Sequence, residues 1–390
     1  MEAIRNENDE YEVVTYEKWD QMNLQDDLLR GIYAMGFENP SQIQKTAIMP
    51  VIQKRDVIAQ APSGTGKTGA FAVGSLERVN PAEKTIQVII LAPTHELVKQ
   101  ISTVISGISS MMNGIRIKTL VGGTPVNDDI RDLRENTPHI IVGSTGRVND
   151  MLRRNQLDTR SIKLIVLDEA DEMLSGGFQD QVYNIFQSLP LTTQTAIFSA
   201  TIPPYILEMT DKFMKNPVKI TLEAEKLNLE GIEQFYLAVN NDEEKFTALK
   251  SLFDGLSINQ TIIYVNSVQR VIELYDAMMK DGYSVACLHS SMSRDERDNS
   301  LREFRSGAFR VLISSNVTSR GIDIQQVSTV INFDLPRSVN TYLHRIGRSG
   351  RWGRKGVAIN FITRQDVSNM KFIENHYKSN IKELPSEFGK

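Results

Sequence analysis

The chain has 390 residues, of which 41% are hydrophobic and 24% charged, and its formal net charge is −4. This length suits two domains of about 200 residues each, and no apolar run reaches the roughly 18–20 residues that span a bilayer, so we expect no membrane-spanning segment. The slightly acidic balance argues against binding of nucleic acid over the whole surface, because such proteins tend to be basic, and it leaves only a local groove for such contacts.

Short apolar runs rich in β-branched residues alternate with longer helical patterns, which predicts an α/β fold with parallel sheets. The runs are almost continuously apolar, as is typical of strands that helices cover on both faces. In the first half we expect strands at 56–60, 86–92, 139–142, 164–167 and 195–198. In the second half we expect them at 261–265, 284–288, 310–314, 329–333 and 356–361.

The polar stretch 221–231 (TLEAEKLNLEG) has no strand pattern and is predicted to be a linker. It separates a first domain at 16–220 from a second domain at 232–390. Residues 1–15 are expected to form a flexible N-terminal segment, and the last five residues are expected to be loosely ordered.

The segment 61–68 (APSGTGKT) follows a predicted strand and precedes a helical pattern, which is the context of a phosphate-binding P-loop. Gly64 and Gly66 allow backbone N–H groups to turn toward phosphate oxygens. We expect Lys67 to reach the β- and γ-phosphates of ATP and the Thr68 hydroxyl to bind Mg²⁺. The alternative is a chance glycine-rich turn, since the first residue is alanine where the general pattern has glycine.

The segment 168–171 (DEAD) directly follows the apolar run 164–167, and ligands of open α/β sheets bind at the carboxyl ends of strands. We expect Asp168 to hold Mg²⁺ through water and Glu169 to orient and polarise the attacking water. The alternative is a solvated acidic turn at a helix N-terminus. Three carboxylates within four residues of a buried strand favour the catalytic interpretation.

Three arginines, Arg345, Arg348 and Arg351, recur every third residue, and we expect them to project from one face of a helix. An arginine that contacts the γ-phosphate in the transition state typically accelerates phosphoryl transfer by about 10³–10⁵. The alternative is an ordinary basic surface helix, but three glycines within 344–354 (HRIGRSGRWGR) would weaken such a helix.

Taken in order, these motifs resemble those of the DEAD-box RNA helicases of superfamily 2, and the resemblance covers about residues 19–361. It implies two tandem RecA-like domains, each a parallel sheet flanked by helices, with ATP and Mg²⁺ between them. It also implies RNA-stimulated ATP hydrolysis, closure on single-stranded RNA, and local, non-processive unwinding of duplexes. The alternatives are an ATP-gated RNA clamp or scaffold component, a translocating DNA helicase of the same superfamily, and a regulator without activity.

Three further segments carry the same resemblance. GFENPSQIQ (36–44) is similar to the adenine-recognising Q motif, which implies that adenine stacks on Phe37 and is read by Gln44. SAT (199–201) is similar to the motif that couples hydrolysis to strand separation. SRGID (319–323) is similar to ARGID, which implies ribose binding by its last residue. Trp19 lies where the family has an isolated upstream aromatic residue.

The resemblance assigns the site residues to sets. Nucleotide binding is implied for Phe37, Gln44, Ser63, Gly64, Thr65, Gly66, Lys67, Thr68, Asp323, Arg348 and Arg351. Catalysis is implied for Lys67, Asp168, Glu169, Arg348 and Arg351, and metal binding for Thr68 and Asp168. RNA binding through the backbone, independent of sequence, is implied for Pro93, Thr94, His95, Gly123, Arg147, Asn266, Arg297 and Ser315. Coupling is implied for Asp171, Ser199, Thr201 and His344.

The sequence departs from the family pattern in four places. His95 replaces the arginine of PTREL, STGR (144–147) lacks the proline of TPGR, SSN (314–316) replaces STD, and Ser319 replaces the alanine of ARGID. None of these changes touches the P-loop, the DEAD carboxylates or the arginines. We therefore expect intact ATP chemistry, with RNA affinity reduced or more sensitive to pH; the alternative is neutral drift that is compensated elsewhere.

Within the family, several stretches are most similar to the translation initiation factors of the four-A type, which implies a monomer and a helical-repeat scaffold protein that braces both domains. The single cysteine, Cys287, cannot form an intramolecular disulfide, and the first residues do not resemble a signal peptide. We therefore expect a cytoplasmic protein without membrane contact, with the nucleus as the alternative compartment.

Overall fold

The computed structural model describes residues 14–62, 64–174, 177–210, 212–222, 232–255, 260–315, 327–349 and 356–385. The chain divides into two compact units, Met1–Leu222 and Glu223–Lys390, which we call the first and second domains. Most of the predicted linker (223–231), the first 13 residues and the last five lie outside the described residues. None of the described helices is long and apolar enough to cross a membrane.

The first domain contains a parallel sheet that has seven strands within the described residues, in the order β3-β4-β2-β5-β6-β1-β7. The strands are β1 (Val57–Gln60), β2 (Val88–Ala92), β3 (Ile117–Leu120), β4 (Ile140–Ser144), β5 (Leu164–Asp168), β6 (Gln194–Ser199) and β7 (Val218–Thr221). The helices are η1 (Trp19–Met22), α1 (Asp26–Ala34), α2 (Gln42–Ile52), α3 (Lys67–Glu77), α4 (His95–Ile108), η2 (Ser109–Met111), α5 (Val126–Glu135), α6 (Thr145–Arg153), α7 (Ala170–Leu174), α8 (Gln179–Gln187) and α9 (Pro204–Thr210).

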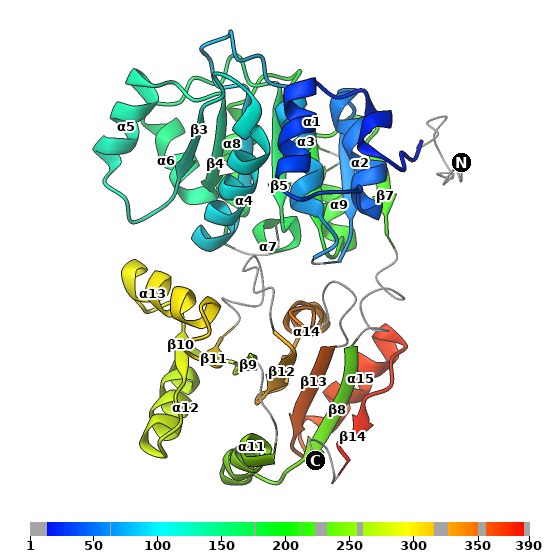
Figure 1. The fold of residues 1–390 in the computed structure, drawn as a ribbon, viewed down its shortest axis with the longest axis vertical. Coiled ribbons are helices and arrows are strands. Elements are labelled where there is room, and N and C mark those ends of the chain that lie inside the picture. The colour runs from blue at the N-terminus through cyan, green and yellow to red at the C-terminus, as the bar shows by residue number, and fades with distance from the viewer. Residues whose placement is uncertain are drawn as a thin grey trace. The chain divides into compact units, whose positions relative to one another are not determined.

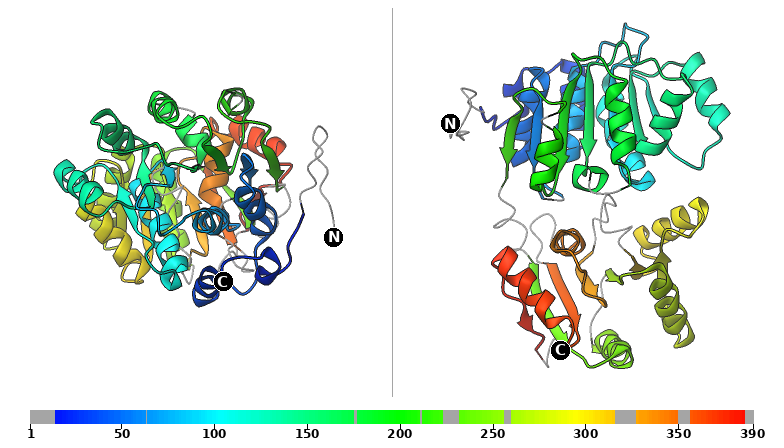
Figure 2. Two further views of the ribbon diagram at one scale, coloured as in Figure 1. Left: turned by 90° about the horizontal axis from the view of Figure 1, so that it is seen from above. Right: turned by 180° about the vertical axis from the view of Figure 1, so that it is seen from behind.

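Helices cover both faces of this sheet, which explains why its central strands are continuously apolar. Along β2, Val88 and Ile90 pack into one core with α1, α2, α3 and α4, whereas Ile89 and Leu91 pack into a second core with α6, α7 and α8. The first group of helices lies in front of the sheet in Figure 1, and the opposite face is seen from behind in Figure 2.

The second domain repeats this architecture with the strand order β10-β11-β9-β12-β13-β8-β14, again parallel and seven-stranded within the described residues. The strands are β8 (Ile232–Ala238), β9 (Thr261–Tyr264), β10 (Ala286–Leu288), β11 (Val311–Ser314), β12 (Thr329–Asn332), β13 (Gly356–Ile362) and β14 (Lys382–Glu383). The helices are α11 (Asp242–Gly255), α12 (Val268–Lys280), α13 (Arg294–Arg305), α14 (Val339–Ile346) and α15 (Val367–Tyr377). The predicted α/β fold class with two similar domains is confirmed.

All ten predicted strands are present, but β3, β7, β8 and β14 were not predicted. β3, β7 and β14 lie at sheet edges, where half-buried or exposed polar positions interrupt the apolar pattern. β8 is bordered on one side only by the two-residue β14, and two successive polar residues, Glu233 and Gln234, interrupt the apolar pattern at its start. The predicted linker also began too early, because Thr221 pairs with Gln60 of β1 as the last residue of β7.

Candidate active site

The P-loop joins β1 to α3 in a conformation that its glycines make possible. Gly64 and Gly66 have φ values of 81° and 100°, a region that residues with a side chain rarely occupy. Helix α3 begins at Lys67, so the free backbone N–H groups of its first turn are available to an anion. The Lys67 ammonium donates to the carbonyl of Ala61 at 2.8 Å. This geometry suits a phosphate group. The predicted Ser63 lies outside the described residues.

The segment predicted to recognise adenine lies directly against this loop. Gln44 of α2 accepts a hydrogen bond from the Ser41 backbone N–H at 2.8 Å and donates through Nε2 to the Gly66 carbonyl at 3.1 Å. Trp19 is 1% exposed and donates through its indole N–H to the Phe37 carbonyl at 2.9 Å. Trp19 therefore fixes the loop that carries Phe37, whereas adenine contacts by Phe37 and Gln44 stay predictions.

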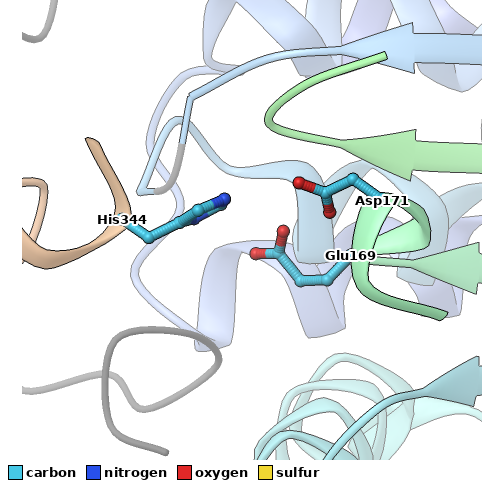
Figure 3. A group of neighbouring side chains, drawn as sticks. All are labelled: Glu169, Asp171 and His344. Atoms are coloured by element: carbon cyan, nitrogen blue, oxygen red, sulfur yellow. The ribbon is translucent and has the colours of Figure 1, made fainter. Parts of the chain in front are cut away.

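The DEAD segment leaves the carboxyl end of β5 with an unusual backbone. Glu169 has a φ of 51°, in the left-handed region that costs energy for residues other than glycine and is often found at functional sites. Its backbone N–H donates to Oδ1 of Asp168 at 3.0 Å. The carboxyl groups of Glu169 and Asp171 point to the same side of the chain (Figure 3). The turn therefore presents several carboxylates together at the end of one strand.

The electrostatics of this turn favour a bound cation. Burial raises the pKa of Asp168, and the neighbouring Glu169 carboxylate raises it further, while Lys67 opposes both effects. The Lys67 ammonium lies 3.9 Å from Oε1 of Glu169. The other oxygen of Glu169 is buried without a hydrogen-bond partner among the described residues. Carboxylate oxygens are the ligand atoms that Mg²⁺ prefers, and this turn brings several of them together.

Hydrogen bonds connect the DEAD segment to the SAT segment, which follows β6. Ser199 accepts from the Asp171 backbone N–H at 3.2 Å, and the Thr201 hydroxyl donates to Oδ2 of Asp171 at 2.7 Å. The Ala61 backbone N–H donates to the Ser199 carbonyl at 3.0 Å, which brings in the P-loop. The sheet order β5-β6-β1 thus places three segments from distant parts of the sequence side by side.

The predicted RNA-binding residues of the first domain follow three further strands, at the same carboxyl end of the sheet. Pro93, Thr94 and His95 follow β2, Gly123 follows β3, and Arg147 follows β4 at the start of α6. The Thr94 hydroxyl caps α4 by accepting from the Leu97 N–H at 3.2 Å. A Cβ atom added at Gly122 would lie 3.3 Å from Nε2 of His95, so the loops after β2 and β3 are in contact.

In the second domain, the predicted RNA-binding residues occupy equivalent positions. Asn266 follows β9, Ser315 follows β11, and Arg297 lies on α13. The Asn266 side chain already donates to the Leu335 carbonyl at 2.9 Å and accepts from Arg345 at 2.8 Å. An RNA contact by Asn266 therefore stays a prediction. Because the side chain already has two partners, the backbone of its loop is as good a candidate for this contact as the side chain.

The expected row of arginines on one helix face does not form. Helix α14 contains His344 and Arg345 but ends at Ile346, so Arg348 lies beyond it. Arg345 is 0% exposed and donates to the Asp334 carbonyl at 2.8 Å, with its guanidinium 5.1 Å from the centre of the Tyr264 ring. Local helical spacing was a poor guide here, because core hydrogen-bond acceptors draw Arg345 inward. The predicted Arg351 and Asp323 lie outside the described residues.

Apart from Arg147, which was predicted to bind RNA, sequence reasoning missed the members of two polar networks. A network in the second domain links Asp242, Lys245, Arg270 and Asp334. A cluster in the first domain contains Lys118, Thr124, Asp129, Asp132 and Arg147. No local signal marks either set, since charged residues in helical patterns normally face solvent.

Two family models match the chain: DEAD/DEAH box helicase over residues 41–209 and helicase conserved C-terminal domain over residues 244–353. The eukaryotic initiation factor 4A of Caenorhabditis elegans is 49% identical over 95% of this chain and 91% of its own length. The ATP-dependent RNA helicase eIF4A of Saccharomyces cerevisiae is 48% identical over 97% of this chain and 94% of its own length. Among solved structures, S. cerevisiae Dbp5 bound to RNA and ADP BeF3 is 36% identical with a TM-score of 0.86, over 94% of this chain and 95% of that chain.

Proposed function

The chain belongs to the DEAD/DEAH box helicase family, and from this premise we propose that it is an ATP-dependent RNA helicase that acts in translation initiation. RNA stimulates its hydrolysis of ATP, and hydrolysis is coupled to local, non-processive unwinding of duplexes. The observation that carries this proposal is the carboxyl edge of the first sheet, where P-loop, DEAD and SAT segments adjoin the loops predicted to bind RNA. Both ligands can thus act on one continuous edge.

On the ATP side, the backbone of the P-loop and Lys67 hold the phosphates, and Phe37 and Gln44 bind adenine. Thr68 and Asp168 would hold Mg²⁺, which suits the buried oxygen donors there and supplies positive charge to the phosphates when bound. Glu169 orients the attacking water and accepts its proton.

The second domain completes the reaction in this proposal. Arg348 and Arg351 neutralise the charge that develops on the γ-phosphate, Asp323 binds the ribose, and His344 takes part in coupling. These roles rest on the family to which the chain belongs. In the first domain, the hydrogen bond from Thr201 to Asp171 supports the coupling role of the SAT segment.

RNA is held by its sugar–phosphate backbone, so binding is independent of base sequence. The two domains close on ATP and single-stranded RNA, and if both ligands select the closed state, each must strengthen the binding of the other by the same factor. We further propose that the protein is a cytoplasmic monomer, with the nucleus as the alternative compartment, and that a helical-repeat scaffold protein braces both domains. The similarity to initiation factor 4A supports this last part.

The test is hydrolysis of ATP by the full chain with and without single-stranded RNA, followed by strand displacement on RNA and DNA duplexes. We expect RNA to raise the rate and unwinding to require RNA in the substrate. Hydrolysis without RNA stimulation would favour the ATP-gated clamp. Unwinding of duplexes made only of DNA would favour a DNA helicase instead.

Replacing His95 by arginine is expected to strengthen RNA binding. His95 occupies the first position of α4, and an arginine there would bring a permanent positive charge and a planar fork of N–H donors, which suit a phosphate better than an imidazole does. One added phosphate contact steepens the dependence of log K on log salt by about 0.7 for single strands. Titration of labelled RNA between low and high salt measures this slope. An unchanged slope and affinity would mean that position 95 does not limit binding.

A further inference from the structure

A group of charged and polar side chains joins the segments after β3 and β4 that we propose to bind RNA. It consists of Lys118 on β3, Thr124 in the loop after β3, Asp129 and Asp132 on α5, and Arg147 on α6, and we call it the Asp129 cluster. Helices α5 and α6 lie at the same end of the first domain as β3 in Figure 1. The cluster therefore connects two of the three RNA-facing loops of this domain.

Asp129 is the centre of this cluster. It is buried, and its two carboxylate oxygens contact two different cations. Oδ1 lies 3.2 Å from the Lys118 ammonium, and Oδ2 pairs with Nη1 of Arg147. Lys118 also contacts Oδ2 of Asp132 at 2.5 Å. The four formal charges sum to zero, so removal of Lys118 alone would leave the cluster, Arg147 included, with a net charge of −1.

Arg147 is 8% exposed and is held from one side only. Its Nη1 donates to Asp129 and, at 3.0 Å, to the Thr124 hydroxyl, while Nη2 donates to the Thr124 carbonyl at 2.8 Å. A guanidinium has five N–H groups, so these bonds leave the Nε–H and one Nη2–H without a partner among the described residues. A guanidinium holds its N–H groups in a planar fork, and such a fork can bind two oxygens of one phosphate.

We propose that Asp129 and Lys118 are positioning residues for RNA binding: Asp129 orients the guanidinium of Arg147 toward a phosphate, and Lys118 offsets the negative charge of Asp129. This inference rests on the proposed function, because it assumes that Arg147 contacts RNA. A pre-oriented side chain binds more tightly, since less conformational entropy is lost on binding. Without Lys118, the carboxylates of Asp129 and Asp132 would repel the phosphate.

The test is a double-mutant cycle on the full chain, with a labelled oligouridine, Mg²⁺ and a non-hydrolysable ATP analogue. Arg147→Met is expected to weaken RNA binding by roughly 10- to 100-fold, as for loss of hydrogen bonds to a charged group, and Asp129→Asn by about tenfold. The double variant should bind as weakly as Arg147→Met alone, because Asp129 acts only through Arg147. Additive effects, or an affinity that is unchanged or higher in Asp129→Asn, would overturn the proposal.

Lys118→Met provides a second, independent measurement at a more exposed position. We expect several-fold weaker RNA binding with a much smaller change in the salt slope than the loss of a phosphate contact causes, since Lys118 acts on the phosphate only through the charges of Asp129 and Asp132. A slope reduced by about 0.7, as expected for Arg147→Met, would identify Lys118 as a direct phosphate contact and contradict its positioning role. If circular dichroism shows that Asp129→Asn does not fold, Lys118→Met is the variant that tests the proposed positioning role.

The matched controls are Asp158→Asn and Arg160→Met, which make the same changes in an exposed ion pair that precedes β5, at the amino ends of the strands. Both should bind RNA like the unmodified protein. If the unmodified protein itself fails to bind RNA, the proposed function is wrong. If it binds RNA and the cluster variants bind equally well, only the present inference is wrong.

Discussion

Replacing Glu169 by glutamine is expected to lower the turnover number for RNA-stimulated ATP hydrolysis by about 10²–10⁴-fold, the usual contribution of a positioned general base. Glutamine keeps the size of the side chain but cannot accept a proton from water. The loss should be specific, because Oε2 of Glu169 has no hydrogen-bond partner among the described residues and Oε1 lies 3.9 Å from the Lys67 ammonium. The carboxylate is therefore available for the reaction and is not needed to hold a neighbouring group.

The measurement is steady-state ATP hydrolysis at saturating RNA, analysed for the turnover number and the KM for ATP separately. The KM should change little, since the P-loop and Lys67 bind the phosphates. Glu135→Gln, which makes the same change at an exposed position near the end of α5, is the matched control and should keep full activity. If Glu169→Gln hydrolyses ATP at the normal rate, Glu169 is not the catalytic carboxylate.

Replacing Asp334 by asparagine is expected to lower the free energy of unfolding of the second domain by about 3–5 kcal/mol, as for other broken buried ion pairs. Asp334 is 7% exposed and receives hydrogen bonds from Arg270 Nε at 2.6 Å and from Lys245 at 3.1 Å. Lys245 is 5% exposed, and its other ion-pair contact, with Asp242, is 3.8 Å long. Without the carboxylate, a buried ammonium would lose its main counter-charge.

Hydrogen exchange of β9 and β12 in the full chain measures this loss, with β2 and β5 of the first domain as internal references. Asp281→Asn breaks the more exposed pair with Lys250 and should cost at most about 1 kcal/mol. Equal losses of unfolding free energy in the two variants would show that burial of the Asp334 network does not add to the stability of the second domain.

The loss of unfolding free energy in Asp334→Asn should depend on pH in a defined direction. Burial raises the pKa of Asp334, but hydrogen bonds from Arg270 and the charge of Lys245 outweigh it, so the pKa lies below its usual value. A lowered pKa stabilises the folded state above the unfolded pKa of about 3.9, and this contribution is lost as the pH falls through the folded pKa. The difference between the two proteins should therefore shrink below about pH 4.

The sequence alone was sufficient to predict those features of this protein that depend on local patterns. Continuous apolar runs predict the central strands, because helices cover these strands on both faces. The P-loop is recognisable since its glycines adopt backbone conformations closed to other residues, and the DEAD segment because its carboxylates follow a buried strand directly. All three signals involve neighbours within about ten residues of each other, which is the range in which periodicity is informative.

Only the tertiary structure decided how distant segments meet. The order β3-β4-β2-β5-β6-β1-β7 places the SAT segment between the DEAD segment and the P-loop, and nothing local encodes that order. The edge strands β3 and β7 were not predicted because polar residues at half-buried or exposed positions interrupt their apolar runs. Arg345 and Arg147 both look like surface cations in the sequence, yet one is enclosed in the core and the other is held by Asp129. Where a long charged side chain points depends on acceptors that the fold brings from elsewhere in the chain, and those partners exist only once the sheet has assembled.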